Sequence, residues 1–247
     1  MATTDHYQHP AIDLMHAHRS VRSYTDQPVS DALVEQAVRA GQAAATSSNV
    51  QAYCVIRVRD DVHRAVFAEL AGPQEKVRTS PVFFVICGDV RKQRIGCERA
   101  GETYNLKLEG CLISAIDAAL FAQNMVLALE AMGLGTCYIG GLRNDVAKVV
   151  ETLKLPESVY PLFGLCAGYP AEAPMERPRL GVEGVLFEGG YPDDAVVAAH
   201  VERYDETYRR YLSERNAQPG AIEGSWSGAM QTKVSSVKRA ELAEVYR

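Results

Sequence analysis

Short apolar runs bounded by turn-forming residues predict four β-strands in this chain. The first run alternates apolar and polar positions around Val55, Ile56 and Val58, which favours a strand with one buried face. The second is a continuous run of β-branched and aromatic residues that ends at Gly88-Asp89, so it should be buried more deeply. The predicted strands are residues 52–59, 81–87, 136–139 and 160–167.

Apolar residues at helical spacing, together with start and stop signals, predict six helices. Pro10 suits the first turn of one helix, and Ser30 suits the N-cap of the next. Asn144 suits the N-cap of a helix that Pro156 ends. The longest helix is apolar on nearly every face and stops at Gly133-Leu134-Gly135, so it should be buried on all sides. The predicted helices are residues 10–17, 31–43, 109–132, 144–155, 194–212 and 227–246.

The order of these elements predicts an α+β fold. Strands and helices mix without strict β-α-β alternation, and several helices follow one another. A chain of 247 residues with 47% hydrophobic residues can bury one substantial core, so we expect a single domain over residues 1–247. Prolines and glycines make residues 170–190 irregular, which predicts an excursion at about 170–247 whose last two helices are joined by a flexible segment, 216–224.

The charge balance and the chain start narrow the class of protein. A formal net charge of −5 leaves no general positive field for the phosphates of nucleic acid, so nucleic acid is not an expected partner. The N-terminal residues lack the charged and apolar regions of a signal peptide, and no apolar run reaches the length of about 18 residues that spans a bilayer. We therefore expect a soluble, cytoplasmic protein that does not contact a membrane.

The six cysteines are predicted to be reduced thiols. They form no C-x-x-C pair, and four of them lie inside apolar runs predicted as strands or helices, which favours buried thiols over a disulfide framework or a zinc site. The histidines show no metal-binding spacing and no G-x-S-x-G motif is present, so we expect neither a metalloenzyme nor a serine hydrolase. The cysteines are Cys54, Cys87, Cys97, Cys111, Cys137 and Cys166.

Arg19-Ser20-Val21-Arg22 is the sharpest local sign of a ligand. Two guanidiniums beside a hydroxyl suit a phosphate group, because arginine can donate two parallel charge-assisted hydrogen bonds to phosphate oxygens. A surface turn with solvated arginines gives the same pattern, so the motif alone decides nothing. Arg177-Pro178-Arg179 forms a second basic pair in the irregular segment, where solvated side chains are the ordinary expectation.

Two glycine clusters do not form a dinucleotide-binding fingerprint. In the stretch from Gly133 to Gly141 a helix precedes the first glycines and a strand follows them, which reverses the strand-glycine-helix order of a Rossmann site. Gly140-Gly141 at the end of the strand could let a planar ligand approach the backbone. A tight turn would require the same glycines, and these residues alone do not separate the two readings.

Five blocks in the right order resemble one family. The chain is similar to the nitroreductase and flavin-reductase family, in its oxygen-insensitive, NADPH-dependent branch of major nitroreductases and FMN reductases. The resemblance implies an α+β fold with a central mixed or antiparallel sheet flanked by helices. It also implies an intertwined homodimer that holds FMN in a cleft built from both subunits. The blocks are residues 18–22, 45–51, 133–143, 162–170 and 177–179.

The resemblance assigns flavin contacts by position. Arg19, Ser20, Arg22 and Arg179 match the family's groups around the FMN phosphate and ribityl chain, with His18 beside them and Arg177 where the family often has lysine. Ser47, Ser48 and Gln74 match residues that reach polar atoms of FMN, and Tyr138, Ile139, Gly140 and Gly141 match the backbone wall against the isoalloxazine. Arg215 aligns with an arginine that engages NADPH, but residues 216–224 lack the further cations of relatives, so NADPH or NADH stays open.

The implied reaction is a ping-pong reduction. NAD(P)H delivers a hydride to the flavin, and a nitroaromatic, a quinone or free flavin is then reduced, with no catalytic residue of the protein required. Two other readings remain. One is a specialised flavoenzyme of a single pathway, such as a reductive dehalogenase or a biosynthetic reductase. The other is a flavin-binding protein without useful turnover.

Overall fold

A computed structural model describes residues 8–105, 107–215, 224–235, 239 and 242. The chain divides into two compact units, which we describe separately. The first comprises Met1–Pro174 and Arg239–Arg247, and the second comprises Met175–Lys238. The second unit begins within the excursion that was expected from about residue 170. The expectation that residues 1–247 form a single flavin domain stays a prediction.

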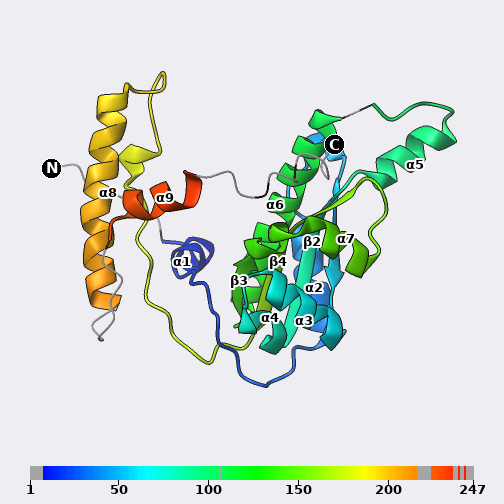
Figure 1. Ribbon diagram of the computed structural model, residues 1–247, viewed down its shortest axis with the longest axis horizontal. Helices are drawn as coiled ribbons and strands as arrows, with labels where there is room; N and C mark the ends of the chain where they lie inside the picture. The colour runs from blue at the N-terminus through cyan, green and yellow to red at the C-terminus, as the bar shows by residue number, and fades with distance from the viewer. Residues whose placement is uncertain (1–7, 106, 216–223, 236–238, 240–241, 243–247) are drawn as a thin grey trace. The chain divides into compact units, whose positions relative to one another are not determined.

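The first unit is built on a four-stranded antiparallel sheet with the strand order β1-β2-β4-β3 (Figure 1). Each strand lies at one of the four apolar runs, so the predicted strands and the α+β fold class are confirmed. β2 is buried at every position, as its unbroken apolar run indicated. The strands are β1 (Tyr53–Arg57), β2 (Val82–Asp89), β3 (Gly135–Ile139) and β4 (Val159–Gly168).

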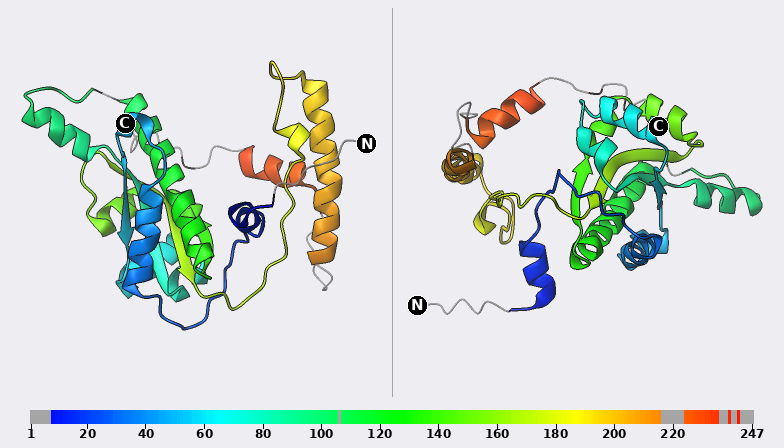
Figure 2. Two further views of the ribbon diagram at one scale, coloured as in Figure 1. Left: turned by 180° about the vertical axis from the view of Figure 1, so that it is seen from behind. Right: turned by 90° about the horizontal axis from the view of Figure 1, so that it is seen from below.

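Helices cover both faces of the sheet and bury a core on each side. On one face, α2 (Asp31–Gln42) and α6 (Leu108–Ala131) lie side by side (Figure 2), and the ring of Phe121 stacks 4.5 Å from that of Tyr53. On the other face, α3 (Asp61–Leu70), α4 (Glu75–Thr79) and α7 (Val146–Leu153) enclose a second apolar cluster. There Phe67 of α3 meets Phe83 of β2 with ring centroids 6.2 Å apart.

The capping residues match the predicted helix starts with one correction. His9 caps α1 (Pro10–His16), and the Ser30 hydroxyl accepts a hydrogen bond from the Leu33 amide at 3.3 Å. The helix expected to start after Asn144 is instead capped by Asp145, whose carboxylate accepts from the Lys148 amide at 2.8 Å. Asn144 ends a short 3₁₀ turn, η2 (Gly140–Asn144), because the strand end needs one more tight turn before α7 begins.

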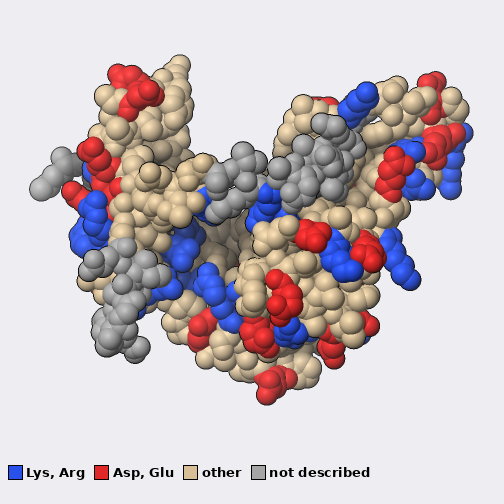
Figure 3. All heavy atoms as spheres, in the orientation of Figure 1, with Lys and Arg blue, Asp and Glu red and all other residues tan. Residues whose placement is uncertain are grey.

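α5 (Arg91–Arg99) is a charged surface helix that the apolar pattern did not predict, and the pattern likewise did not predict α3 and α4. Acidic and basic side chains intermingle on it in Figure 3. Arg94 lies between Glu98 at 3.2 Å and Glu157 at 2.7 Å. Because these pairs are largely exposed, each contributes little to the free energy of unfolding.

α6 is the longest apolar helix, and within the described residues only part of its surface is covered. One face buries Ser114, Asp117, Phe121 and Met125 against the sheet and α2. A second face is exposed, so the expectation that this chain buries α6 on all sides is not met by the described residues. By length and composition alone α6 could cross a membrane, so the expectation that no apolar run reaches that length was wrong; the core helix of a water-soluble protein passes the same test. The exposed face carries Leu108, Leu112, Ile116 and Leu120, with exposed fractions of 72%, 49%, 57% and 44%.

The second unit is formed by η3 (Val182–Gly184), α8 (Asp194–Arg215) and α9 (Trp226–Val234). α9 packs on α8 through an edge-to-face contact between Trp226 and Tyr204, whose ring centroids are 5.5 Å apart. The Ser227 amide and hydroxyl both donate to the buried Asp205 carboxylate, at 2.8 and 2.5 Å. The predicted helix 227–246 is thus present at its start and ends at Val234; most of its remaining positions and the linker 216–223 lie outside the described residues.

Candidate functional site

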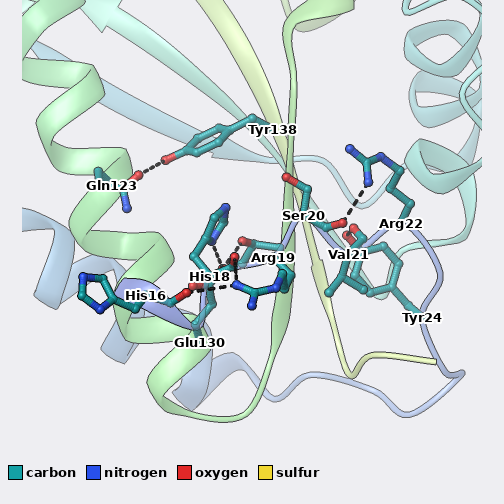
Figure 4. Close-up of polar contacts among 11 residues, drawn as sticks. His16, His18, Arg19, Ser20, Val21, Arg22, Tyr24, Gln123, Glu130 and Tyr138 are labelled. Atoms are coloured by element: carbon teal, nitrogen blue, oxygen red, sulfur yellow. Dashed lines mark hydrogen bonds and ion pairs between the residues drawn. The ribbon is translucent and has the colours of Figure 1, made fainter. Parts of the chain in front are cut away.

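The basic segment after α1 runs along the edge of the sheet beside β3. Ser20 forms a parallel bridge with Thr136, and the Val21 amide donates to the Thr136 carbonyl at 2.9 Å. Val21 is buried directly against Gly135, where an added Cβ would approach the valine side chain to 2.6 Å. Gly135 is therefore required for the close approach that fixes this segment, and Figure 4 shows the side chains that the segment presents.

The two arginines of the segment point to different surroundings. The Arg22 guanidinium is exposed and donates to the Ser20 carbonyl at 3.0 Å, which keeps its charge beside Ser20. Arg19 donates to the carbonyls of His16 and His18 at 3.0 and 2.8 Å. It lines a small pocket of about 240 Å³, and that lining includes Val21 but neither Ser20 nor Arg22. The segment thus presents Ser20 and Arg22 together, with Arg19 apart from them.

Glu130 ties this segment to α6 and β3. One carboxylate oxygen, Oε1, lies 2.8 Å from His18 Nδ1 and accepts a hydrogen bond from the Thr136 hydroxyl at 2.8 Å (Figure 4). The other oxygen, Oε2, is buried and has no hydrogen-bond partner within the described residues. A buried carboxylate oxygen without a partner is costly, so it marks a place where a further donor would be stabilising.

Ser47 and Ser48 lie on a strained, exposed loop that begins as the 3₁₀ turn η1 (Ser47–Asn49). Ser48, Asn49 and Gln51 have φ angles of 45°, 59° and 52°, in the left-handed region that non-glycine residues rarely adopt. Such strain persists only where the surroundings enforce it, and it concentrates at functional sites.

Asp117 holds both ends of this loop. It lies on α6 with no exposed surface, and its two carboxylate oxygens accept hydrogen bonds from the amides of Ser47 at 2.9 Å and Ala52 at 3.0 Å. Charged hydrogen bonds of this kind contribute about 1.5–3 kcal/mol each, which is enough to offset the strain of the loop. The hydroxyls of Ser47 and Ser48 are thereby kept at the surface in a fixed arrangement.

The end of β3 brings Gln74 close to Gly141. The Gln74 side-chain amide donates to the Ala71 carbonyl at 2.5 Å, and a Cβ on Gly141 would lie 2.6 Å from the Ala71 Cα. Packing against Ala71 therefore explains Gly141 without a ligand. Gly140 is different, because the nearest atom to an added Cβ is the flexible end of Arg143 at 3.5 Å.

Tyr138 lies on the exposed side of β3 and Ile139 is buried behind it. The Tyr138 hydroxyl donates to the Gln123 side chain at 3.5 Å, a long contact, and the ring lies edge-on to Phe163 (Figure 4). Burial raises the pKa of Tyr138, and the negative charge of Glu130 raises it further. The tyrosine therefore stays protonated, as a neutral aromatic surface with a hydrogen-bond donor.

The remaining predicted residues belong to the second unit. The Pro178 carbonyl accepts a hydrogen bond from the Tyr204 hydroxyl at 2.7 Å, which fixes the Arg177-Pro178-Arg179 stretch to α8. Burial raises the pKa of Tyr204, and the positive charges of Arg179 and Arg177 oppose that rise. Arg215 is exposed at the last residue of α8.

Comparison with known protein families decides the identity. The model of the nitroreductase family matches residues 15–169, and the model of the nitroreductase family C-terminal domain matches residues 177–247. The chain belongs to the nitroreductase family. The resemblance predicted from the five sequence blocks is therefore confirmed, and the boundary between the two family models lies close to the boundary between the two structural units.

Curated nitroreductase relatives match the chain over most of its length. An FMN reductase (NADPH) of Bacillus subtilis is 42% identical over 87% of this chain and 88% of its own. An oxygen-insensitive NADPH nitroreductase of Salmonella typhimurium is 40% identical over 84% of this chain and 85% of its own.

Solved nitroreductase structures share the fold. A nitroreductase from B. subtilis has a TM-score of 0.89 at 38% identity and covers 95% of this chain and 96% of its own. The NADPH:FMN oxidoreductase of Vibrio harveyi, complexed with NAD⁺, has a TM-score of 0.85 at 34% identity and covers 95% of both chains.

Two residues of this nitroreductase that the sequence reasoning missed are Asp117 and Glu130. Both are carboxylates within the mostly apolar stretch 110–132, and Asp117 is the only charged residue between positions 110 and 129. A charged residue inside a buried helix must find hydrogen-bond partners, so this isolated position was the signal that could have identified it.

Proposed function

We propose that this chain is an FMN-dependent oxidoreductase that uses NAD(P)H to reduce small acceptors such as nitroaromatics, quinones or free flavin. The observation that carries the proposal is full-length similarity to relatives named as NADPH-dependent FMN reductases and nitroreductases, at about 40% identity. The chain has the polar features such a site needs, in the Ser20–Arg22 segment and the clamped Ser47–Ser48 loop. We further propose that it acts in the cytoplasm.

The residues present fit FMN. A phosphate dianion needs cations and hydroxyl donors, which Arg22 and Ser20 offer at one surface. Family position assigns Arg177 and Arg179 to the same phosphate, and also Arg19, whose guanidinium here donates to the carbonyls of His16 and His18. Polar edges of a flavin ring need fixed donors, which the strained loop offers through Ser47 and Ser48. A ring stacked near the strand end needs a backbone without a side chain, and Gly140 leaves that space.

The chemistry that FMN would supply when bound is the transfer of two electrons from NAD(P)H to an acceptor, in two half-reactions. The protein's own residues bind and orient. Glu130 fixes the His18 ring and the segment behind Ser20, Asp117 fixes the loop of Ser47, and Tyr138 contributes a neutral aromatic surface. In this assignment positioning and electrostatics carry the rate enhancement, and no side chain acts as an acid or base.

We also propose that the enzyme is a homodimer that joins through α6. Leu108, Leu112, Ile116 and Leu120 are spaced four residues apart, so they form one apolar stripe along the helix. Continuous apolar surface of this kind marks an interaction site on a water-soluble protein. A second copy of the same helix is the occupant that family membership favours, and it would bury the stripe.

The visible spectrum of the purified protein tests the proposed function. We expect a yellow protein with flavin absorption that bleaches when NADPH or NADH is added without oxygen, and that recovers when a quinone or a nitroaromatic follows. A colourless protein that takes up no added FMN would overturn the proposal. Slow bleaching without recovery would instead identify a flavin-binding protein that does not turn over.

Arg215 is expected to select between the two nicotinamide cofactors. Its guanidinium is exposed at the end of α8, where it can pair with the 2′-phosphate that NADPH carries and NADH lacks. Arg215→Ala should raise the KM for NADPH by about 10-fold, the loss of one charge-assisted contact, and leave the KM for NADH nearly unchanged. Arg210→Ala, five residues earlier on α8, is the matched control. Equal changes for both cofactors in Arg215→Ala would exclude this role.

A further inference from the structure

Two pairs of cysteines stand directly opposite each other on neighbouring strands of the sheet. Cys54 of β1 is the register partner of Cys87 of β2, and Cys137 of β3 is the register partner of Cys166 of β4. Both pairs belong to the apolar cluster under α3, α4 and α7. All four are free thiols, as the sequence predicted. The sheet therefore offers two chemically identical pairs whose surroundings can be compared.

The backbone spacing at the first pair suits a disulfide. Hydrogen-bonded and non-hydrogen-bonded pairs alternate along an antiparallel ladder. Val58 donates to the Phe83 carbonyl opposite it, and Asp89 donates to the Ala52 carbonyl opposite it. Cys54 is two positions from Ala52 and four from Val58, so Cys54 and Cys87 are also a hydrogen-bonded pair. Such pairs have Cα atoms about 5.5 Å apart, and disulfides most often join Cα atoms about 5.5–6 Å apart. The Cβ atoms of such a pair lie about 5.5 Å apart and a disulfide needs about 3.8 Å, so the two strands must draw together locally to form the bond.

The two cysteines of the first pair lie opposite each other, and they differ in exposure and in the direction of their pKa shifts. Cys54 is partly exposed on β1, an edge strand of the sheet, whereas Cys87 is fully buried. The neighbouring Cys87 thiol lowers the pKa of Cys54, and the charge of Lys92 lowers it further, against burial and the charge of Asp89. The Cys54 thiol and burial raise the pKa of Cys87. The shifts favour the thiolate, which is the nucleophile, at Cys54 and the protonated thiol at Cys87.

The second pair lacks the exposed thiol and the lowered pKa of the first. Cys137 and Cys166 are both buried, and their thiols donate to the backbone carbonyls of Tyr138 and Lys76, at 3.7 and 3.4 Å. Burial raises the pKa of Cys137, and it raises the pKa of Cys166 to about 12. Because the thiolate is the reactive form, these two thiols should be inert.

We propose that Cys54 and Cys87 form a reversible oxidation site that reacts with hydroperoxides. The Cys54 thiolate attacks the terminal peroxide oxygen, the O–O bond breaks, and the leaving hydroxide or alkoxide takes up a proton as Cys54 becomes a sulfenic acid. The Cys87 sulfur then attacks Cys54 Sγ, an S–S bond forms, and the hydroxyl leaves with the Cys87 proton as water. Two thiols lose two electrons and the peroxide gains them; a dithiol reverses the change.

Peptide mapping of the full-length reduced protein tests this site. After one equivalent of hydrogen peroxide, we expect a single crosslink between the peptides of Cys54 and Cys87, with the loss of two hydrogens and full reversal by dithiothreitol. A crosslink between other cysteines as the main product, or no crosslink while other thiols are oxidised, would overturn the proposal. Because the mapping needs neither flavin nor turnover, its failure leaves the proposed enzymatic function untouched.

Two serine variants separate the roles of the partners. Cys87→Ser should stop the reaction at the Cys54 sulfenic acid, which dimedone traps, whereas Cys137→Ser is the matched control and should give the same crosslink as the unmodified chain. Alkylation by iodoacetamide should be faster at Cys54 than at Cys137, since the thiolate is the reactive form and the pKa is lowered at Cys54 and raised at Cys137. Equal alkylation rates would contradict the activation of Cys54.

Discussion

Replacing Arg22 and Arg179 together with alanine is expected to give a folded protein that purifies without colour. Each guanidinium would donate charge-assisted hydrogen bonds to the FMN phosphate, and such bonds contribute about 1.5–3 kcal/mol each. The double variant should therefore bind FMN about 10²–10⁴-fold more weakly, since 1.4 kcal/mol corresponds to a factor of about ten. Flavin absorbance per protein chain after gel filtration measures the loss directly.

The controls for this experiment separate phosphate binding from general charge and from folding. Arg39 is exposed on α2 and pairs with Glu35 of the same helix, so Arg39→Ala removes a surface guanidinium elsewhere and should leave the protein yellow. Far-ultraviolet circular dichroism and the thermal midpoint should match the unmodified chain, because Arg22 and Arg179 are exposed. Full FMN occupancy in the double variant would show that these residues do not hold the phosphate.

Introducing a charge into the stripe on α6 is the second prediction with a large expected effect. We expect Ile116→Lys to dissociate the proposed dimer, so that light scattering gives the mass of a single chain, 27.0 kDa. Burying an isoleucine contributes about 1.5–3 kcal/mol, and a two-fold symmetric dimer loses this contribution once in each chain. Burying the lysine ammonium adds a further cost. The dimer dissociation constant should therefore rise at least about 10²-fold.

Val62 provides the matched control for the stripe. It is an apolar side chain of similar type on α3 with an exposed fraction of 71%, and it lies outside the stripe. Val62→Lys should leave the dimer unchanged, so a difference between the two variants measures the interface and not the added charge. If Ile116→Lys remains a dimer of unchanged affinity, the second copy does not cover this helix.

The sequence predicted the buried elements of this fold well and the charged ones poorly. All four strands and the long helix α6 carry apolar runs, because they lie in the core. α5 buries none of its residues, so it has no apolar periodicity to detect. α4 is only five residues long and buries Val77 alone. α7 was placed correctly, with its cap displaced by one residue, because Asn144 and Asp145 are both good capping residues and only the turn geometry chooses between them.

The candidate site could be located from sequence only where its residues lie close together in the chain. Ser20 and Arg22 form a local motif, and the resemblance identified Ser47 and Ser48. The residues that hold those groups in place were missed, because their partners lie far away in the chain. Ser47 meets Asp117 across 70 positions, and His18 meets Glu130 across 112. Local patterns carry no information about such contacts.

α6 contributes both to the candidate site and to the proposed dimer interface. Its inward side carries Asp117, which fixes the loop of Ser47, while its outward side carries the apolar stripe around Ile116. Inserting or deleting one residue in this helix would turn everything beyond it by about 100°. Such a change would remove the anchor from the loop and misalign the proposed dimer interface at the same time, so this segment should tolerate no change in length.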